Sequence, residues 1–173
     1  MLGFTLGISQ GCQPIFSYNY GARQYSRVRE AYRKAIVAAS VICCIAFVCF
    51  QLFPRPIVAL FDPSGSEEYF QFAERYFRIY MFMTLANAFQ PITANFFTSI
   101  GKAKRGALIA LTRQVIFLIP LILIFPLFLG IDGVMYAGPI ADSAAVVVAL
   151  ALVTREMKRM PHVDEPVAAD TPV

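Results

Sequence analysis

The sequence predicts an all-α integral membrane protein, a partial transmembrane helix bundle made of the end of one helix and four full spans. Hydrophobic residues make up 58% of the chain, above the roughly 45–50% that is usual in soluble domains. Charged residues make up only 15%. Four apolar stretches have the length, about 20 residues, that a helix needs to cross a bilayer. They are Lys34–Phe53, Ile79–Ile100, Ala107–Leu129 and Gly133–Val153.

The first apolar stretch, Leu2 to Phe16, is too short to cross a bilayer comfortably. We expect it to be the end of a helix, and the chain to be the C-terminal part of a larger protein. We do not expect it to be a secretory signal, because Met1-Leu2-Gly3-Phe4 has no basic region and no small-residue cleavage site follows.

The charges in the loops predict how the chain crosses the membrane. Basic residues follow the first, third and last apolar stretches, whereas acidic residues predominate between the second and third. Basic loops stay cytoplasmic, so we expect a cytoplasmic C-terminus. The net charge of +4 is spread over short clusters rather than one face, which indicates a bilayer and not nucleic acid as partner. The basic clusters are Arg23, Arg27, Arg29, Arg33 and Lys34; Lys102, Lys104 and Arg105; and Arg155, Lys158 and Arg159.

Turn and capping signals divide the remaining chain. Pro54-Arg55-Pro56 ends the second stretch, and the Ser-x-x-Glu spacing of Ser64 and Glu67 predicts a capping box at the start of a helix that enters the bilayer near Arg78. Pro161 to Val173 mixes proline, acidic and small residues without periodicity. We therefore predict a helical bundle over residues 1–156 and a disordered cytoplasmic tail over 157–173.

Polar residues within the apolar stretches recur on one side of two predicted helices. In the third stretch they fall within an arc of roughly 140°, next to Pro91. In the first stretch they recur at steps of four, next to Pro14. Such stripes either pack helices together or line a polar cavity beside a proline-broken helix. The two sets are Thr84, Asn87, Gln90, Asn95 and Thr98; and Thr5, Ser9, Gln13 and Ser17.

Two charges lie deep in the predicted spans. Arg113 is roughly 12 Å and Asp142 roughly 16 Å from the same basic side, at 1.5 Å per helical residue. A buried acid is costly, so Asp142 should face the bundle interior, and Arg113 is a candidate partner for it. Alternatively, Arg113 extends to the interface and Asp142 is a structural hydrogen-bond acceptor.

No residues converge as an enzyme site would require, because no nucleophile with a base, paired carboxylates or metal cluster is evident. We expect neither catalysis nor a cofactor. The cysteines lie in apolar stretches without metal spacing, so we interpret them as packing residues. His162, in the polar tail, has no second ligand nearby. The cysteines are Cys12, Cys43, Cys44 and Cys49.

The order of several motifs resembles the C-terminal lobe of multidrug and toxic compound extrusion (MATE) transporters, especially the bacterial branch. QGCQPIFSYNYGAR at 10–23 resembles the end of that lobe's second helix. Gln90-Pro91 with GKAK at 101–104, then RQVIFLIP at 113–120, then PIAD at 139–142, resemble its later helices. The resemblance covers residues 1 to about 156 and implies that an N-terminal lobe is missing, which would be a partner of this chain if it is encoded separately.

The family implies an antiporter in the bacterial plasma membrane that exports small organic, often cationic, compounds in exchange for protons or sodium ions. By resemblance, the wall of its substrate cavity takes polar contacts from Gln13, Asn87, Gln90 and Asn95 and an apolar contact from Tyr18. We expect the fragment to be inactive alone. Two alternatives stay open: a lipid-linked-sugar flippase of the same wider fold, which would need several basic residues in its cavity, and a non-transporting remnant or accessory subunit.

Overall fold

The computed structural model describes residues 2–61, 66–81 and 83–161 and contains only helices and short connections within them. Three stretches of these residues are long and apolar enough to cross a membrane: Tyr25–Leu52, Ala103–Phe128 and Tyr136–Arg159. The prediction of an all-α membrane protein is confirmed. The elements are α1 (Leu2–Gly21), α2 (Tyr25–Leu52), α3 (Pro54–Phe61), α4 (Glu67–Met81), α5 (Met83–Ser99), α6 (Ala103–Leu111), η1 (Thr112–Leu118), α7 (Ile119–Leu129) and α8 (Ile131–Arg159).

Several helix limits differ from those that hydropathy predicts. α1 continues beyond Phe16 to Gly21, and α2 begins at Tyr25 rather than Lys34. The predicted span 79–100 is divided between the end of α4 and α5. α8 ends at Arg159, so residues 157–159 of the predicted tail are helical, and 162–173 lie outside the described residues. Helix limits extend past the apolar stretches because hydropathy marks the hydrocarbon core rather than the helix.

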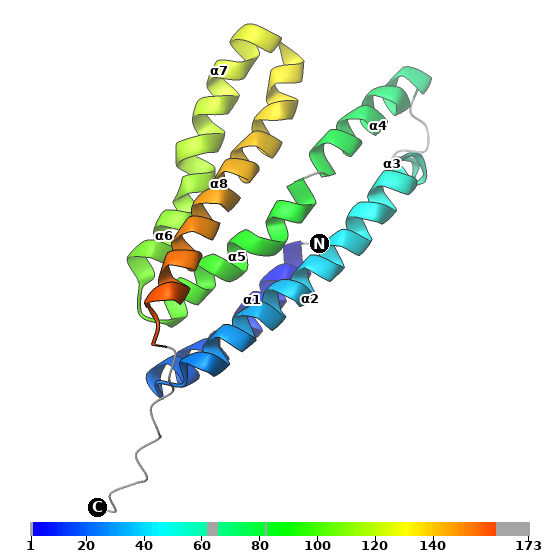
Figure 1. Ribbon diagram of the computed structural model, residues 1–173. Coiled ribbons are helices and arrows are strands. Elements are labelled where there is room, and N and C mark those ends of the chain that lie inside the picture. Colours follow the sequence, from blue (N-terminus) through cyan, green and yellow to red (C-terminus); the bar gives the residue numbers. More distant parts are fainter. Residues whose placement is uncertain (1, 62–65, 82, 162–173) are drawn as a thin grey trace, which may run out of the picture.

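α5 lies at the centre of the bundle, with α1 and α2 on one side and α6, α7 and α8 on the other (Figure 1). The core between α1, α2 and α5 is aromatic: the Phe96 ring packs 5.4 Å from Phe16 and 4.9 Å from Tyr32, centroid to centroid. The Tyr32 hydroxyl lies 2.8 Å from Thr93 Oγ1, so the one polar atom of this ring is paired. Burial of these rings holds α5 against both neighbours.

The basic clusters gather at one end of the bundle. The end of α1, the start of α2, the α5–α6 turn and the end of α8 lie together there (Figure 1). Glu156 of α8 is buried and accepts hydrogen bonds from Lys102 and Arg105. Arg29 of α2 donates to the Pro161 carbonyl at 2.9 Å. These contacts fasten the last turn of α8 to α6 and α2.

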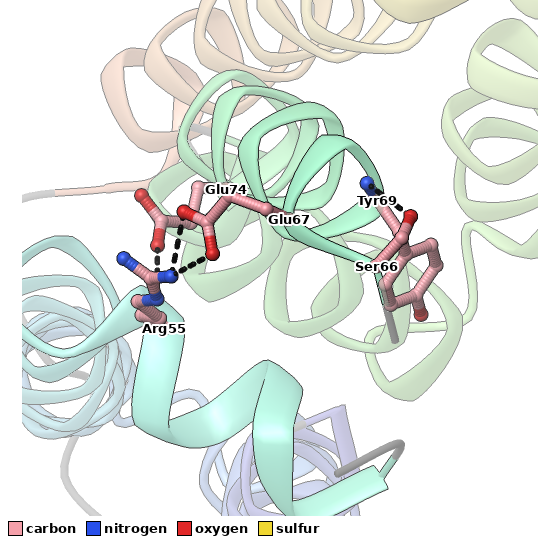
Figure 2. A network of polar contacts seen from close by, with 5 residues as sticks. All are labelled: Arg55, Ser66, Glu67, Tyr69 and Glu74. Atoms are coloured by element: carbon pink, nitrogen blue, oxygen red, sulfur yellow. Dashed lines mark hydrogen bonds and ion pairs between the residues drawn. The ribbon is translucent and has the colours of Figure 1, made fainter. Parts of the chain in front are cut away.

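The opposite end carries the α3–α4 pair (Figure 1). Figure 2 shows Arg55 of α3 reaching Glu67 Oε2 at 2.5 Å and Glu74 Oε1 at 3.7 Å, both on α4. At the start of α4, the Tyr69 N–H donates to Ser66 Oγ at 3.3 Å. Ser64, the predicted cap, lies outside the described residues.

Candidate functional site

The polar stripe of α1 packs against the polar stripe of α5. Ser9 is buried, and its hydroxyl donates to the Pro91 carbonyl at 3.1 Å. Asn95 Nδ2 in turn donates to Ser9 Oγ at 2.6 Å. Nearer the basic end, Ser17 Oγ donates to the Ser99 carbonyl at 3.1 Å. In a membrane such bonds hold helices together, since lipid offers no alternative partner.

Gln90 lies on the other side of α5 and contacts α6. Its side chain is buried, and Nε2 donates to the Ile109 carbonyl at 3.1 Å. The helices approach closely here: a Cβ on Gly106 would stand 2.7 Å from the Ala94 carbonyl oxygen and 2.6 Å from Thr98 Oγ1. Glycine at 106 therefore allows the contact that brings the Gln90 amide to α6.

The third predicted span contains a π-helical segment, η1, that the sequence analysis did not anticipate. The Ile119 N–H donates to the carbonyl of Gln114, five residues earlier, as in a π-helix. Pro120 follows directly; it has no N–H, and its ring crowds the carbonyl four residues before it. A change from four-residue to five-residue bonding leaves a carbonyl in the preceding turn without its usual partner. The Ile109 carbonyl, which accepts from Gln90, lies in that turn.

The two deep charges meet between η1 and α8. Arg113 Nε lies 2.5 Å from Asp142 Oδ1. The Asp142 side chain is 2% exposed and that of Arg113 is 29% exposed. The second carboxylate oxygen, Oδ2, is buried without a hydrogen-bond partner among the described residues. The contact is therefore a single charge-assisted hydrogen bond rather than a two-point fork.

A groove of about 220 Å³ lies between α5 and the α6–η1 segment. Because Pro91 and Ala94 are only half-buried, this strip of α5 is open between its contacts with α1 and with α6. The groove combines the proline of α5, two residues of the π-helix and one cation. Its lining residues are Gln90, Pro91, Ala94, Ala110, Arg113 and Gln114.

The predicted site residues do not all meet at this groove. Gln90 and Arg113 line it together, whereas Asn95 is bonded to Ser9. Gln13 is half-buried on α1. Tyr18 is 77% exposed and points away from the core. The side chain of Asn87 lies outside the described part of the structure.

Two contributions were missed by sequence reasoning. Ala110 continues the four-residue spacing from Gly106, a small-residue pattern that brings helices close in membranes, and Gln114 follows on the same side of the helix at the next step of four. That spacing was the available signal. Glu156 was passed over because the basic residues around it were interpreted only as a topology signal. A lone acid within a basic cluster at a helix end is itself an indication of a paired carboxylate.

Within the described residues, no group of three or more His, Cys, Asp or Glu side chains lies close enough to hold a metal ion. The groove therefore offers hydrogen-bond donors and one guanidinium rather than metal ligands. Fold and groove together describe part of a helical membrane protein with a polar groove between its helices.

Comparisons with known proteins identify the family. A family model described as MatE matches residues 1–124. The multidrug export protein MepA of Staphylococcus aureus is 23% identical over 148 residues, which cover 86% of this chain and 32% of MepA. The solved structure of the MATE multidrug transporter DinF-BH is 36% identical, with a TM-score of 0.81 over 88% of this chain and 34% of that one.

A second solved structure gives the same fold. An outward-facing multidrug resistance MATE family transporter superposes with a TM-score of 0.82 at 21% identity, covering 90% of this chain and 35% of that chain. The chain belongs to the MatE family of membrane transporters. It spans about a third of the length of the curated relatives that it matches.

Proposed function

We propose that this chain forms part of a multidrug efflux antiporter, which exports organic and often cationic compounds in exchange for protons or sodium ions. The observation that carries the proposal is the superposition of 88% of the chain, at 36% identity, on a multidrug transporter of the MATE family. MepA, named as a multidrug export protein, is similar over 86% of the chain.

The arrangement of α5 supports a role in the wall of a substrate cavity. Pro91 lies inside α5 and lacks the N–H of a helical hydrogen bond, and a groove of about 220 Å³ beside it is lined by polar side chains. In a membrane, polar side chains usually face the bundle interior or a water-filled cavity. Gln90 contributes from the groove, and Gln13, Tyr18, Asn87 and Asn95 are further proposed contacts.

Export rather than lipid-linked-sugar flipping is the function that this groove favours. Binding a pyrophosphate calls for several cationic side chains converging on it. Among the described residues that line the groove, Arg113 is the one cation, and it is paired with Asp142. A pyrophosphate would meet a neutral ion pair here.

We propose that the chain does not export drugs by itself. In the proposed antiporter, two lobes rock against each other around a shared cavity, and this chain supplies only one side of that cavity. Cells that express residues 1–173 alone should accumulate ethidium as fast as cells with an empty vector. Co-expression with the N-terminal lobe of a MATE relative should lower accumulation if the pieces assemble. Efflux by the chain alone would refute inactivity, and absence of efflux in every membrane-inserted pairing would count against the transport proposal.

We propose that the protein lies in the bacterial plasma membrane with its C-terminus in the cytoplasm. The three basic clusters share one end of the bundle (Figure 1), which supports that end as cytoplasmic. After the native cysteines are replaced, Ser66→Cys should react with an impermeant thiol reagent added outside intact cells, and Ala103→Cys should not. Both positions are exposed, so the reverse labelling pattern would overturn the orientation.

A further inference from the structure

Arg113 has one edge of its guanidinium engaged and the rest available. Its Nε is bonded to Asp142 Oδ1, and Asp142 is its only hydrogen-bond partner among the described residues. No other described residue accepts a hydrogen bond from the two terminal amino groups of the guanidinium, which can donate to a ligand. Arg113 also lines the groove, and 29% of its side chain remains exposed. The ion pair thus holds the Arg113 guanidinium at the groove while leaving its terminal amino groups available to a ligand.

The other polar residues of the groove differ in what they can offer. Gln90 has its Nε2 occupied by the Ile109 carbonyl. Gln114 is exposed on η1 beside Arg113, and its amide has no hydrogen-bond partner among the described residues. Pro91, Ala94 and Ala110 supply small apolar walls. The groove is a donor-rich pocket with apolar sides.

The charge balance selects which ligand group this pocket would accept. A ligand carboxylate would bring a second negative charge next to the buried Asp142 carboxylate, and like charges in a poorly solvated place repel strongly. A ligand cation would face the guanidinium rather than the shielded carboxylate. A neutral carbonyl oxygen accepts from the free amino groups without adding charge. The volume of about 220 Å³ equals roughly seven waters at about 30 Å³ each, which suits a single ring bearing a carbonyl.

We infer that the groove between α5 and η1 is a subsite for the uncharged carbonyl end of an aromatic small molecule, with Arg113 as the hydrogen-bond donor and Asp142 as the residue that positions it. The inference deepens the proposed function, on which it rests for placing the groove on a transport path. In a transporter of organic cations, this subsite would recognise the part of the substrate that carries no charge.

The test measures binding of 4-fluoroacetophenone to residues 1–173 in lipid nanodiscs by ligand-observed ¹⁹F relaxation. Ala110→Leu fills the groove from α6 without touching the ion pair, and Ala107→Leu adds the same bulk to an exposed position one turn earlier. Saturable binding is expected for the wild type and Ala107→Leu, and binding should be at least roughly tenfold weaker in Ala110→Leu. Equal behaviour of all three would mean partition into lipid only and would overturn the inference.

Two further measurements test the donor and the charge preference. Replacing both charges together, as Arg113→Met with Asp142→Leu, avoids leaving either one buried alone. The ketone should then bind roughly tenfold more weakly, as expected when a hydrogen bond to a charged donor is lost, while circular dichroism stays that of the wild type. Stronger binding of 4-fluorobenzoate or 4-fluorobenzylammonium than of the ketone would refute the proposed ligand class. Because no transport is measured, this subsite can fail or stand independently of drug export.

Discussion

The two ends of the bundle hold ion pairs of the same chemistry in opposite surroundings. At the basic end, the Glu156 side chain is 2% exposed and is bound by Lys102 and Arg105. At the other end, Arg55 pairs with Glu67 (Figure 2), and their side chains are 55% and 62% exposed. A solvated pair contributes about 0–1 kcal/mol, whereas a buried charge that loses its partner costs about 3–5 kcal/mol. Burial, rather than the number of ion pairs, decides which end fastens the fold.

The largest effect is expected when Glu156 loses both partners. The double variant Lys102→Ala with Arg105→Ala strands a buried carboxylate and should lower the free energy of unfolding by about 3–5 kcal/mol. The measurement is unfolding in detergent followed by circular dichroism.

A matched control removes the same charge from the same end. Lys104→Ala with Arg155→Ala changes two exposed residues and should cost less than about 1 kcal/mol. If the two double variants unfold alike, net charge at this end matters and burial of Glu156 does not.

The pair inside the membrane tests whether burial acts in the same way away from the ends. Asp142→Asn removes the charge that faces Arg113 but keeps a side-chain carbonyl that can still accept from Nε. The free energy of unfolding should fall by about 1.5–3 kcal/mol, the range for a hydrogen bond to a charged group. In a full-length transporter, the amount of folded protein should then decrease, and transport of all substrates should decrease in proportion. Unchanged abundance with loss of ion-driven transport alone would make Asp142 a coupling residue instead.

Much of this arrangement could be predicted from the sequence. The apolar stretches indicated the membrane class, and the depths of Arg113 and Asp142, roughly 12 and 16 Å by residue rise, placed them at a similar level. The structure joins them at 2.5 Å. The depth of a residue along its helix depends only on the rise per residue, so it can be calculated without knowing which helices pack beside it.

Partners across helices could not be predicted in the same way. Periodicity gives the side of a helix on which Gln90 and Asn95 lie, but not that one bonds to Ile109 and the other to Ser9. The π-helix also escaped, because hydropathy reports composition and not the hydrogen-bond pattern. Pro120 was visible, yet proline alone does not distinguish a kink from a wider turn.

A smaller loss is expected when the buried member of the basic-end cluster is changed instead of its partners. Glu156→Gln leaves Lys102 and Arg105, whose side chains are 35% and 37% exposed and can turn toward water. The free energy of unfolding should decrease by about 1–2 kcal/mol, less than in the variant that strands the carboxylate. Equal losses in the two variants would show that the three charges act as a unit whichever member is removed. Exposure of the two cations would then not reduce the cost of losing Glu156.

The smallest effect belongs to the exposed end. Arg55→Ala removes the contacts with Glu67 and Glu74 and a guanidinium that lies 5.7 Å from the centre of the Phe70 ring. Because the Arg55 side chain common to these contacts is 55% exposed, the combined cost should stay below about 1 kcal/mol. The cost should also shrink further in high salt, because exposed charges are screened. The measurement is unfolding at low and high salt beside a control, Arg75→Ala, which removes an exposed arginine from α4 instead of α3. A loss of the size seen on stranding Glu156, or one insensitive to salt, would show that the α3–α4 contact is shielded from water and that the two ends are held alike.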